Sequence, residues 1–563
     1  MPTLTVKSHS GEHKVPFIAG QSLREVLDAA GLRVRSGCAG FGACGLCKVR
    51  ILQGDTGPLT ANEQIHIGKY MARPPRHNSG VRALPDTTGA PAIPGSTIRL
   101  ACQCRPEGDV TILLITPPPK SVWRALDIDG KPFDCGVSGS TAVDRLPGDG
   151  TGTELGAAVD VGTTHISLTV HSLGTGRCLA GRTGPNPQNH WGADVMTRLV
   201  NAAEIPERAE AMRLSVTKAI GDALHDIAVC EGIDLHRVTE VTLVANTPML
   251  ALLTGRRVTQ LLTSRGWNGS KDAEEHNAIP ASVCDAWSIA SDALVYPVPP
   301  FGGFVGSDLL AGVVAAGLTE AGVPGLLIDV GTNSEIAVWD GDRLWVTSAA
   351  GGPAFEGCGI GCGMPAEQGA VYSVRWQQGE FVFDVIGGGA AEGLCGSGLI
   401  DLVAYLVQFG TLGETGCFSR TVPATGFEVL PGPQSVVLTK KDIDILQRAK
   451  AAMAAGVEVL LAMAGLASDS LQRVCVGGAF GHTLDVRNAQ AIGLLPSVDP
   501  ERFELCGNTA LSGCGKLLFT ADRCGVVQNI REKTSVISLS QTPEFDNRFI
   551  QHLYLKPYGL TAP

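Results

Sequence analysis

Three cysteines in a short run of small residues constrain this chain most strongly. Residues 36–47 hold Cys38, Cys44 and Cys47 with the spacing C-x5-C-x2-C, and a fourth cysteine, Cys102, follows in the segment RLACQ. Four cysteine thiolates hold a [2Fe–2S] cluster, and the plant-type pattern is C-x4-C-x2-C followed by a distant cysteine. Glycines in the same run suit a loop that turns backbone N–H groups toward bridging sulfides. The four cysteines therefore predict a [2Fe–2S] centre.

A structural zinc site is the alternative for these cysteines. Zinc sites usually take two close cysteine pairs, which the five-residue gap between Cys38 and Cys44 does not provide. A GxGxxG pattern also occurs in the run, but Cys44 lies inside it and no helix opens after it, so we interpret the match as accidental. The 12 histidines show no H-x-x-H or H-E-x-x-H spacing, and we predict no histidine metal site.

The residues around the cysteines predict a small sheet with one helix. Residues 3–7 alternate and turn back into residues 14–18, which predicts a hairpin. A capping box over 22–25 opens a helix that ends at Gly31, and a strand is expected over 47–52.

The segment before Cys102 contains an insertion that separates this cysteine from the other three. A second capping box over 60–63 predicts a short helix, after which residues 70–96 form a proline- and glycine-rich insertion that we expect to be an exposed loop. A strand over 109–115 closes the sheet. The domain is expected to end at residue 117, followed by a linker or bridging segment over 118–153.

This order of elements resembles a [2Fe–2S] ferredoxin of the β-grasp fold. The cysteine loop is one residue longer than the plant type, as in adrenodoxin-type ferredoxins, and RLACQ is similar to the segment that carries their last ligand. The resemblance implies that Cys102 is the fourth ligand and that Cys104 is its neighbour.

Two glycine hairpins recur in the rest of the chain. Residues 157–170 read AAVDVGTTHISLTV, and residues 326–338 read LLIDVGTNSEIAV. Each pattern predicts a strand, a tight turn and a strand, and the turn offers backbone N–H groups and hydroxyls to an anion. Asp160 and Asp329, at equivalent places, suit a hydrated Mg²⁺. A third stretch, RVCVGGAFG at 473–481, predicts a buried strand that runs into a glycine turn.

These three motifs resemble the phosphate-1, phosphate-2 and adenosine motifs of the actin, hexokinase and heat-shock chaperone (ASKHA) superfamily, in which two α/β lobes close on ATP. No P-loop pattern G-x4-G-K-[ST] occurs in the sequence. The expected fold class is therefore multidomain α+β and α/β, with a β-grasp ferredoxin domain (1–117), a linker and a two-lobed actin-like ATPase. The lobes are expected over 154–324 and 325–545, with a C-terminal tail over 546–563.

The resemblance implies a set of nucleotide-site residues. Those expected to contact nucleotide are Gly162, Thr163, Thr164, Gly331, Thr332, Asn333, Gly477, Gly478 and Ala479, and those with expected catalytic roles are Asp160, Asp329 and Glu335. The alternative is a pair of ordinary hairpins with exposed aspartates and a surface glutamate. Asp194 and Arg198, four residues apart on one helix face, either contact phosphate or pair with each other. Cys358, Cys362 and Cys395 either line a client-facing cleft or, as we favour, pack in tight turns.

A ferredoxin joined to such an ATPase resembles the reductive activators of corrinoid proteins. Further stretches similar to that family are NPQ at 186–188, WGADVMTR at 191–198, VANTPML at 244–250, GPAFE at 352–356, CGM at 362–364, CGSGLID at 395–401 and GNTA at 507–510. The resemblance implies an ATP-dependent enzyme that passes one electron from its cluster to an inactive Co(II) corrinoid methyltransferase and so restores Co(I).

The resemblance implies a corrinoid protein and an upstream electron donor as partners, and it suggests a homodimer. Two alternative functions remain. One is a ferredoxin-regulated small-molecule kinase, and the other is a redox scaffold that binds ATP without turnover.

Composition supports a large protein of the cytoplasm. A length of 563 residues suits several domains, and 44 basic against 55 acidic residues, without a basic tract, disfavour nucleic acid as a partner. The N-terminus lacks a signal-peptide pattern, and the longest apolar run, over 451–467, is interrupted by Glu458 and predicts a buried helix, not a membrane span. The 17 cysteines show no disulfide framework, which suits a reducing compartment.

Overall fold

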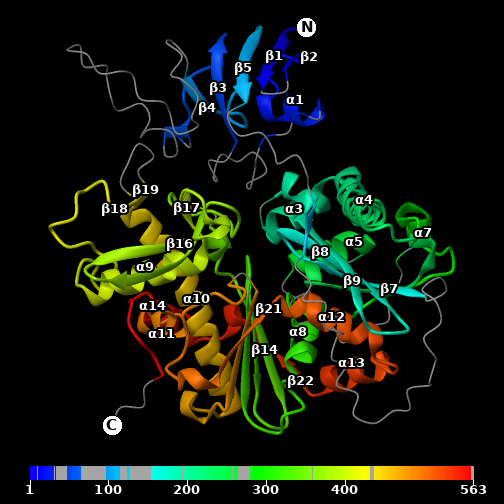
Figure 1. Ribbon diagram of the computed structural model, residues 1–563, viewed down its shortest axis with the longest axis vertical. Coiled ribbons are helices and arrows are strands. Elements are labelled where there is room, and N and C mark those ends of the chain that lie inside the picture. Colours follow the sequence, from blue (N-terminus) through cyan, green and yellow to red (C-terminus); the bar gives the residue numbers. More distant parts are fainter. Residues whose placement is uncertain are drawn as a thin grey trace. The chain divides into compact units, whose positions relative to one another are not determined.

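The computed structural model divides the chain into two compact units, shown in Figure 1. It describes residues 1–8, 11–30, 32, 34, 47–61, 63–64, 97–114, 123–126, 154–192, 194–256, 258–263, 279, 282–357, 359–430, 436–478 and 480–559. The smaller unit comprises Met1–Val122 with Asn189–Ala193 and Val429–Ser435, and the larger unit comprises the remainder.

The smaller unit contains a five-stranded sheet of order β2-β1-β5-β3-β4. The strands are β1 (Thr3–Ser8), β2 (Gly11–Pro16), β3 (Lys48–Gln53), β4 (Thr97–Leu100) and β5 (Val110–Leu114), and the helix is α1 (Leu23–Ala29). The predicted hairpin, helix and strands on either side of the cysteines are therefore confirmed, whereas β4 was not predicted. The cysteine loop up to residue 46 and the 70–96 insertion lie outside the described residues.

Apolar side chains at alternate strand positions pack against α1 and form the core of the smaller unit. Leu4 and Val6 of β1 and Ile112 of β5 are fully buried, as are Leu23 and Leu27 of α1. The predicted capping box that starts α1 is present. The Ser22 N–H donates to the Glu25 carboxylate at 2.9 Å, and the Glu25 N–H donates to the Ser22 hydroxyl at 3.2 Å.

The larger unit contains two six-stranded sheets built on one plan. In each sheet an antiparallel meander of three strands is extended beyond its first strand by two parallel strands. The first sheet uses β7 (Leu155–Val161), β8 (His165–Ser172), β9 (Cys178–Pro185), β10 (Val238–Ala245) and β11 (Leu294–Pro297), and the second uses β12 (Gly325–Val330), β13 (Ser334–Trp339), β14 (Leu344–Ala349), β20 (Arg473–Gly478) and β21 (Phe503–Gly507). The internal repeat expected from the two hairpins is therefore a repeat of a whole sheet.

The remaining elements surround these sheets. The helices are α3 (Val195–Glu204), α4 (Pro206–Glu231), α5 (Thr247–Thr254), α7 (Ser282–Trp287), α8 (Ser307–Ala316), α9 (Gly396–Gln408), α10 (Lys440–Ala464), α11 (Val486–Ala491), α12 (Thr509–Phe519), α13 (Arg523–Glu532) and α14 (Phe545–Gln551). Smaller strands are β15 (Ala370–Gln377), β16 (Glu380–Val385), β17 (Gly393–Leu394), β18 (Phe427–Leu430) and β19 (Val436–Leu438). Helix α10 contains most of the apolar run predicted to be a buried helix. Within the part of the chain that the structure describes, no helix is long and apolar enough to cross a membrane.

Helices α8 and α12 approach each other closely between the two sheets. A Cβ on Gly312 would lie 3.1 Å from the Thr509 hydroxyl, and a Cβ on Gly513 would overlap the Ala311 carbonyl oxygen. Helix α12 also covers the first sheet, because the Cys514 thiol donates to the Thr242 carbonyl of β10 at 3.1 Å. The two sheets therefore share one hydrophobic core.

Two segments differ from the expected linker and tail. Within the expected linker, β6 (Arg124–Ala125) pairs antiparallel with β9 at the edge of the first sheet; the corresponding edge of the second sheet is β22 (Thr534–Val536). Within the expected tail, residues 546–559 pack onto α10, where the Lys450 ammonium donates to the Tyr554 carbonyl at 2.7 Å. Leu555 is fully buried, so this segment is part of the larger unit's packed body.

Candidate functional site

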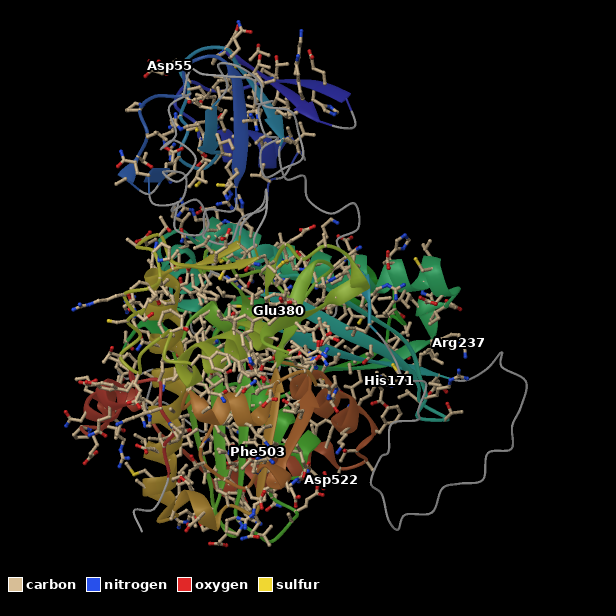
Figure 2. All side chains as sticks on the ribbon, turned by 60° about the vertical axis from the view of Figure 1, so that its left-hand side comes forward. Asp55, His171, Arg237, Glu380, Phe503 and Asp522 are labelled. Atoms are coloured by element: carbon tan, nitrogen blue, oxygen red, sulfur yellow. The ribbon has the colours of Figure 1, made fainter. Side chains whose placement is uncertain are left out.

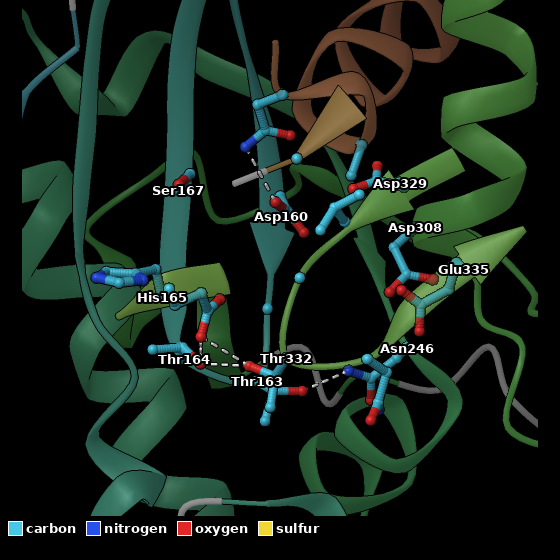
Figure 3. Close-up of a pocket in the computed structure, with 18 of the residues that line it drawn as sticks. Asp160, Thr163, Thr164, His165, Ser167, Asn246, Asp308, Asp329, Thr332 and Glu335 are labelled. Carbon is cyan, nitrogen blue, oxygen red and sulfur yellow. Dashed lines mark hydrogen bonds between the residues drawn. The ribbon is translucent and has the colours of Figure 1, made fainter. Parts of the chain in front are cut away.

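The two predicted hairpin turns meet at one cavity of about 400 Å³ in the larger unit, shown in Figure 3. Ten of the predicted nucleotide-site residues line it, namely Asp160, Gly162, Thr163, Thr164, Asp329, Gly331, Thr332, Asn333, Glu335 and Gly478. Gly477 lies one residue earlier in β20, and Ala479 lies outside the described residues. The cavity is therefore built from both halves of the repeat.

Close approach of the backbone explains the glycine at the first turn. A Cβ on Gly162 would lie 2.7 Å from the His165 carbonyl oxygen, which is closer than real Cβ contacts allow. The turn joins β7 to β8 within three residues, and its backbone is thereby exposed to the cavity. Such a turn offers N–H groups to an anion.

Hydroxyls from the two turns contact each other. The Thr164 and Thr332 side-chain oxygens are 2.7 Å apart, and both hydroxyls lie within hydrogen-bonding distance of Glu356 Oε2, at 3.1 and 3.0 Å. Glu356 ends the 3-10 helix η5 (Pro353–Glu356). Burial raises the pKa of its carboxyl group, although the two hydroxyls partly offset this effect. Glu356 therefore links both turns through one oxygen.

Two buried polar side chains form hydrogen bonds with Thr163 in the first turn. The Asn246 amide donates to the Thr163 hydroxyl at 2.9 Å, and the Arg198 guanidinium donates to the Thr163 carbonyl at 2.7 Å. Asp194 instead caps α3 by accepting from the Thr197 N–H at 2.9 Å. Arg198 thus holds the first turn by binding the backbone carbonyl of Thr163, a role that was not predicted from the sequence.

Four carboxylates gather on one side of the cavity, as Figure 3 shows. Burial, with additional repulsion from neighbouring carboxylates, raises the pKa of Asp160 to about 8, that of Asp308 to about 7 and that of Glu335 well above its ordinary value. Burial also raises the pKa of Asp329. Carboxylates that disfavour one another's ionisation in this way are the ligand type that a hard divalent cation prefers.

The N-terminus of α12 contacts the two predicted magnesium aspartates. The Asn508 amide donates to Asp160 Oδ2 at 3.4 Å, and the Thr509 hydroxyl donates to Asp329. Gly478 approaches Asp329 from β20, where an added Cβ would lie 2.5 Å from Asp329 Oδ1. One helix terminus therefore orients both carboxylates.

Several residues that contribute to this cavity were not predicted from the sequence. Asn246, Glu356 and Asn508 lie in stretches that indicated only a family resemblance, and Asp308, at the start of α8, belongs to no motif. The alternative of a surface glutamate at position 335 is wrong, because Glu335 lines the cavity. Cys362 and Cys395 are buried, whereas Cys358 lies outside the described residues.

Two of the four predicted cluster ligands lie together in the smaller unit. The Cys47 and Cys102 sulfurs are 3.3 Å apart, both side chains are buried, and the Ala101 N–H donates to the Cys47 carbonyl at 2.8 Å. Two thiolates on one tetrahedral metal ion with bonds of about 2.3 Å lie roughly 3.8 Å apart, so the pair fits two ligands of one iron. Cys38 and Cys44 lie outside the described residues. Burial raises the pKa of the neighbouring Cys104 thiol to about 12, so it stays protonated.

A buried ion pair fixes the strand that leads to Cys102. Arg99 donates to both Glu63 oxygens at 2.8 and 2.9 Å, and the Leu100 N–H donates to the same carboxylate at 3.0 Å. Burial alone would raise the pKa of Glu63, but the hydrogen bonds from Arg99 and the backbone hold it below its ordinary value. Arg99 also donates to Thr56 at 2.7 Å, so the buried charges are paired and hydrogen-bonded.

The fold and the two sites define a ferredoxin-type domain joined to an ASKHA-type domain. Comparison with protein families agrees. Residues 6–72 match the 2Fe-2S iron-sulfur cluster binding domain, residues 155–321 match the RACo middle region, and residues 324–562 match the C-terminal domain of RACo, the ASKHA domain.

Individual proteins are similar to this chain over much of its length. The chain is 29% identical over 438 residues to the corrinoid activation enzyme RamQ of Eubacterium limosum, covering 74% of this chain and 73% of RamQ. It is 26% identical over 358 residues to a [Co(II) methylated amine-specific corrinoid protein] reductase of Methanosarcina barkeri, covering 58% of this chain and 65% of that protein. A solved structure of a reductive activator for corrinoid, iron-sulfur protein superposes with a TM-score of 0.63 at 25% identity, covering 98% of both chains. The chain is therefore homologous to the reductive activators of corrinoid proteins, and the resemblance found in the sequence is confirmed.

Proposed function

We propose that this protein is an ATP-dependent reductive activator. It passes one electron from a [2Fe–2S] cluster to a Co(II) corrinoid protein and restores Co(I). The observation that carries the proposal is the presence, in one chain, of a buried thiol pair that fits an iron ligand set and a carboxylate-lined cavity built from two phosphate-type hairpins. The names of RamQ and of the Co(II) corrinoid protein reductase support the same activity.

The smaller unit holds the two described cluster ligands in buried positions. When bound, a [2Fe–2S] cluster supplies a single electron at low potential. Cys47 and Cys102 serve as ligands with Cys38 and Cys44. The Arg99–Glu63 pair holds β4, and with it Cys102, in a fixed position relative to β3.

The cavity of the larger unit holds the nucleotide. Backbone N–H groups of the two turns, with Thr163, Thr164, Thr332 and Asn333, bind the phosphates, and Gly477, Gly478 and Ala479 form the adenosine turn. Asp160 and Asp329 hold Mg²⁺ through its water ligands, and Glu335 orients the attacking water. Asp308 adds to the negative charge that favours the cation.

ATP is needed because the electron moves uphill. Plant-type clusters have reduction potentials of about −400 mV. For one electron, a difference of ~59 mV between the potentials of donor and acceptor corresponds to about 1.4 kcal/mol. A gap of ~100–200 mV therefore requires roughly 2–5 kcal/mol. ATP binding or hydrolysis supplies this free energy by closing the lobes and changing the coordination of the client's cobalt. An upstream electron donor, a homodimeric state and a cytoplasmic location complete the proposal.

Anaerobic reduction of a client tests the function directly. The reduced protein is mixed with a Co(II) corrinoid methyltransferase, and the Co(I) absorption band is followed with and without Mg-ATP. We expect Co(I) only with Mg-ATP, and its loss in Asp160→Asn and in Cys102→Ser. Asp222→Asn, which removes an exposed carboxylate paired with Lys218 on α4, is the matched control and should retain activity.

Two outcomes contradict the proposal. Co(I) formation at the same rate without nucleotide would remove the role of the cavity. Failure to produce Co(I) with several unrelated corrinoid clients, despite an intact cluster and bound ATP, would favour the ferredoxin-regulated kinase.

A further inference from the structure

Two thiols lie side by side on neighbouring strands of the second large sheet. Cys475 of β20 and Cys506 of β21 place their sulfurs, together with a carboxylate oxygen of Glu504, within 4.8 Å of one another. The Cys475 thiol donates a hydrogen bond to Cys506, whose own thiol lies 3.4 Å from the Glu504 carbonyl oxygen. Cys475 is fully buried, whereas Cys506 is partly exposed. One sulfur of the pair is therefore reachable from solvent and the other is not.

A bulge in the sheet produces this arrangement. Strands β20 and β21 run parallel, and their register shifts so that Val476 faces Leu505 while Gly477 faces Gly507. Cys506 is the additional residue of the bulge, and Phe503, labelled in Figure 2, begins its strand. A bulge disrupts the ladder locally and re-aims side chains.

The surrounding charges favour redox chemistry over a metal site. Arg473 binds Glu504 through two hydrogen bonds of 2.7 Å, which occupy both carboxylate oxygens. Two thiols then remain as free ligands, fewer than the four of a structural zinc site. The same Arg473 places positive charge beside both thiols, which favours the thiolate form that reacts with oxidants, whereas the Glu504 carboxylate opposes this effect and outweighs it at Cys506.

The two thiols differ in reactivity. The hydrogen bond from Cys475 lowers the pKa of the Cys506 thiol, and burial opposes this effect only in part. The same hydrogen bond, together with burial, raises the pKa of Cys475. A partly exposed cysteine with thiolate character beside a second, resolving cysteine is the usual arrangement of a redox-sensitive thiol.

We propose that Cys506 and Cys475 are a redox-sensitive pair that a low-molecular-weight disulfide oxidises to an intramolecular disulfide. The Cys506 thiolate attacks one sulfur of the oxidant, forms a mixed disulfide and releases one small thiol. Cys475 then gives up its proton, and its sulfur attacks Cys506 Sγ, which releases the second small thiol. Two electrons pass from the two cysteines to the oxidant, and the oxidant's S–S bond is exchanged for the protein's.

Both strands continue directly into the carboxylate side of the cavity. Strand β20 reaches Gly478, which abuts Asp329, and β21 leads through Gly507 to Asn508 and Thr509, which hydrogen-bond the two aspartates. Gly507 has a φ of +62°. A covalent bond at the bulge draws residue 506 toward β20 and displaces the start of α12. We expect nucleotide affinity to fall by about tenfold, because one or two of these hydrogen bonds are lost.

Oxidation of the full-length protein tests the pair. The anaerobic protein is treated with a small-molecule disulfide and then alkylated, its peptides are mapped by mass spectrometry, and binding of a fluorescent ATP analogue is measured before and after treatment. Cys506→Ser and Cys475→Ala are compared with Cys417→Ser, which changes an exposed cysteine of the larger unit. Cluster absorbance is recorded in every sample, so that damage to the smaller unit is recognised.

The expected result is a peptide pair linked through residues 475 and 506 in the wild type and in Cys417→Ser, with weaker nucleotide binding that a thiol reductant reverses. A stable mixed disulfide at Cys506 without linkage would overturn the proposal, as would an equal loss of nucleotide binding in Cys506→Ser. The disulfide itself is independent of the proposed function, whereas its effect on nucleotide rests on the proposed ATP site. If the reduced protein binds no ATP analogue, the proposed function fails, while the peptide map still decides whether the pair forms.

Discussion

Thr164 and Thr332 lie 168 residues apart in the chain, yet their side-chain oxygens are 2.7 Å apart and share the Glu356 carboxylate. The two hydroxyls thus contact each other and Glu356, although the proposed function assigns both of them to phosphate. A phosphate that takes these hydroxyls must separate them from Glu356. Nucleotide binding is therefore expected to exchange hydrogen bonds to Glu356 for hydrogen bonds to phosphate, because each hydroxyl donates a single hydrogen.

Replacing Thr332 with valine should weaken nucleotide binding by roughly 10- to 100-fold. A hydrogen bond to a charged group contributes about 1.5–3 kcal/mol, and valine keeps the shape of threonine without the hydroxyl. Thr347→Val is the matched control, because this buried hydroxyl of β14 donates to the Ile537 carbonyl at 2.7 Å and does not line the cavity. Isothermal titration with Mg-ATP measures both variants, and equal affinities would contradict the assignment of Thr332 to phosphate.

Nucleotide binding should strengthen as pH rises through about 7 to 8. The folded-state pKa values of Asp308 and Asp160, about 7 and about 8, lie above the ordinary aspartate value of about 3.9. The nucleotide-free fold therefore binds more protons than the unfolded chain, and its free energy of unfolding falls as pH rises from about 4 to 8. Mg²⁺ requires the ionised carboxylates, so binding releases protons over the same interval.

Calorimetry in two buffers of different ionisation enthalpy counts these protons. Proton release near neutral pH should diminish in Asp160→Asn and persist in Asp222→Asn. Binding that releases no protons in the wild type would show that the carboxylates are already ionised.

Replacing Glu63 with glutamine should destabilise the smaller unit by about 3–5 kcal/mol, because the Arg99 charge would remain buried without its partner. Loss of cluster absorbance during chemical denaturation reports this change. Arg105→Ala is the control, since Arg105 and Glu25 form an exposed pair at 3.9 Å, whose removal should change stability by at most about 1 kcal/mol. Similar effects in both variants would show that the buried pair has no special role.

Replacing Cys102 with serine should abolish the visible absorption of the [2Fe–2S] cluster, whereas Cys104→Ser should retain it. Cys102 lies beside Cys47 at ligand distance, while the neighbouring Cys104 belongs to the hydrophobic core and remains protonated. Anaerobic reconstitution with iron and sulfide, followed by absorption spectroscopy, separates the two variants. A cluster retained in Cys102→Ser would require a different fourth ligand.

Sequence patterns within a few residues predicted the elements that depend mainly on neighbouring residues in the chain. Alternation and capping boxes identified the hairpins and α1, and glycine turns placed Asp160 and Asp329 at equivalent positions of two sheets. Asp308 and Glu356 carry no such pattern, because they reach the cavity only through the packing of α8 against the sheets and of η5 against α9 and α10. The bulge that pairs Cys506 with Cys475 is likewise a property of strand register, which a single strand's sequence does not show.

The position of α12 against β7 and β10 has a consequence for how the protein is made. The first large sheet ends at Pro297, but the helix that covers its core, through Leu518 against Gly156 and Cys514 against Thr242, is synthesised only after residue 509. At about 5–20 residues per second, the sheet waits on the order of ten seconds or more on the ribosome with an apolar face uncovered. We therefore expect the nascent first lobe to need chaperones, and a fragment cut at residue 324 to aggregate when expressed alone.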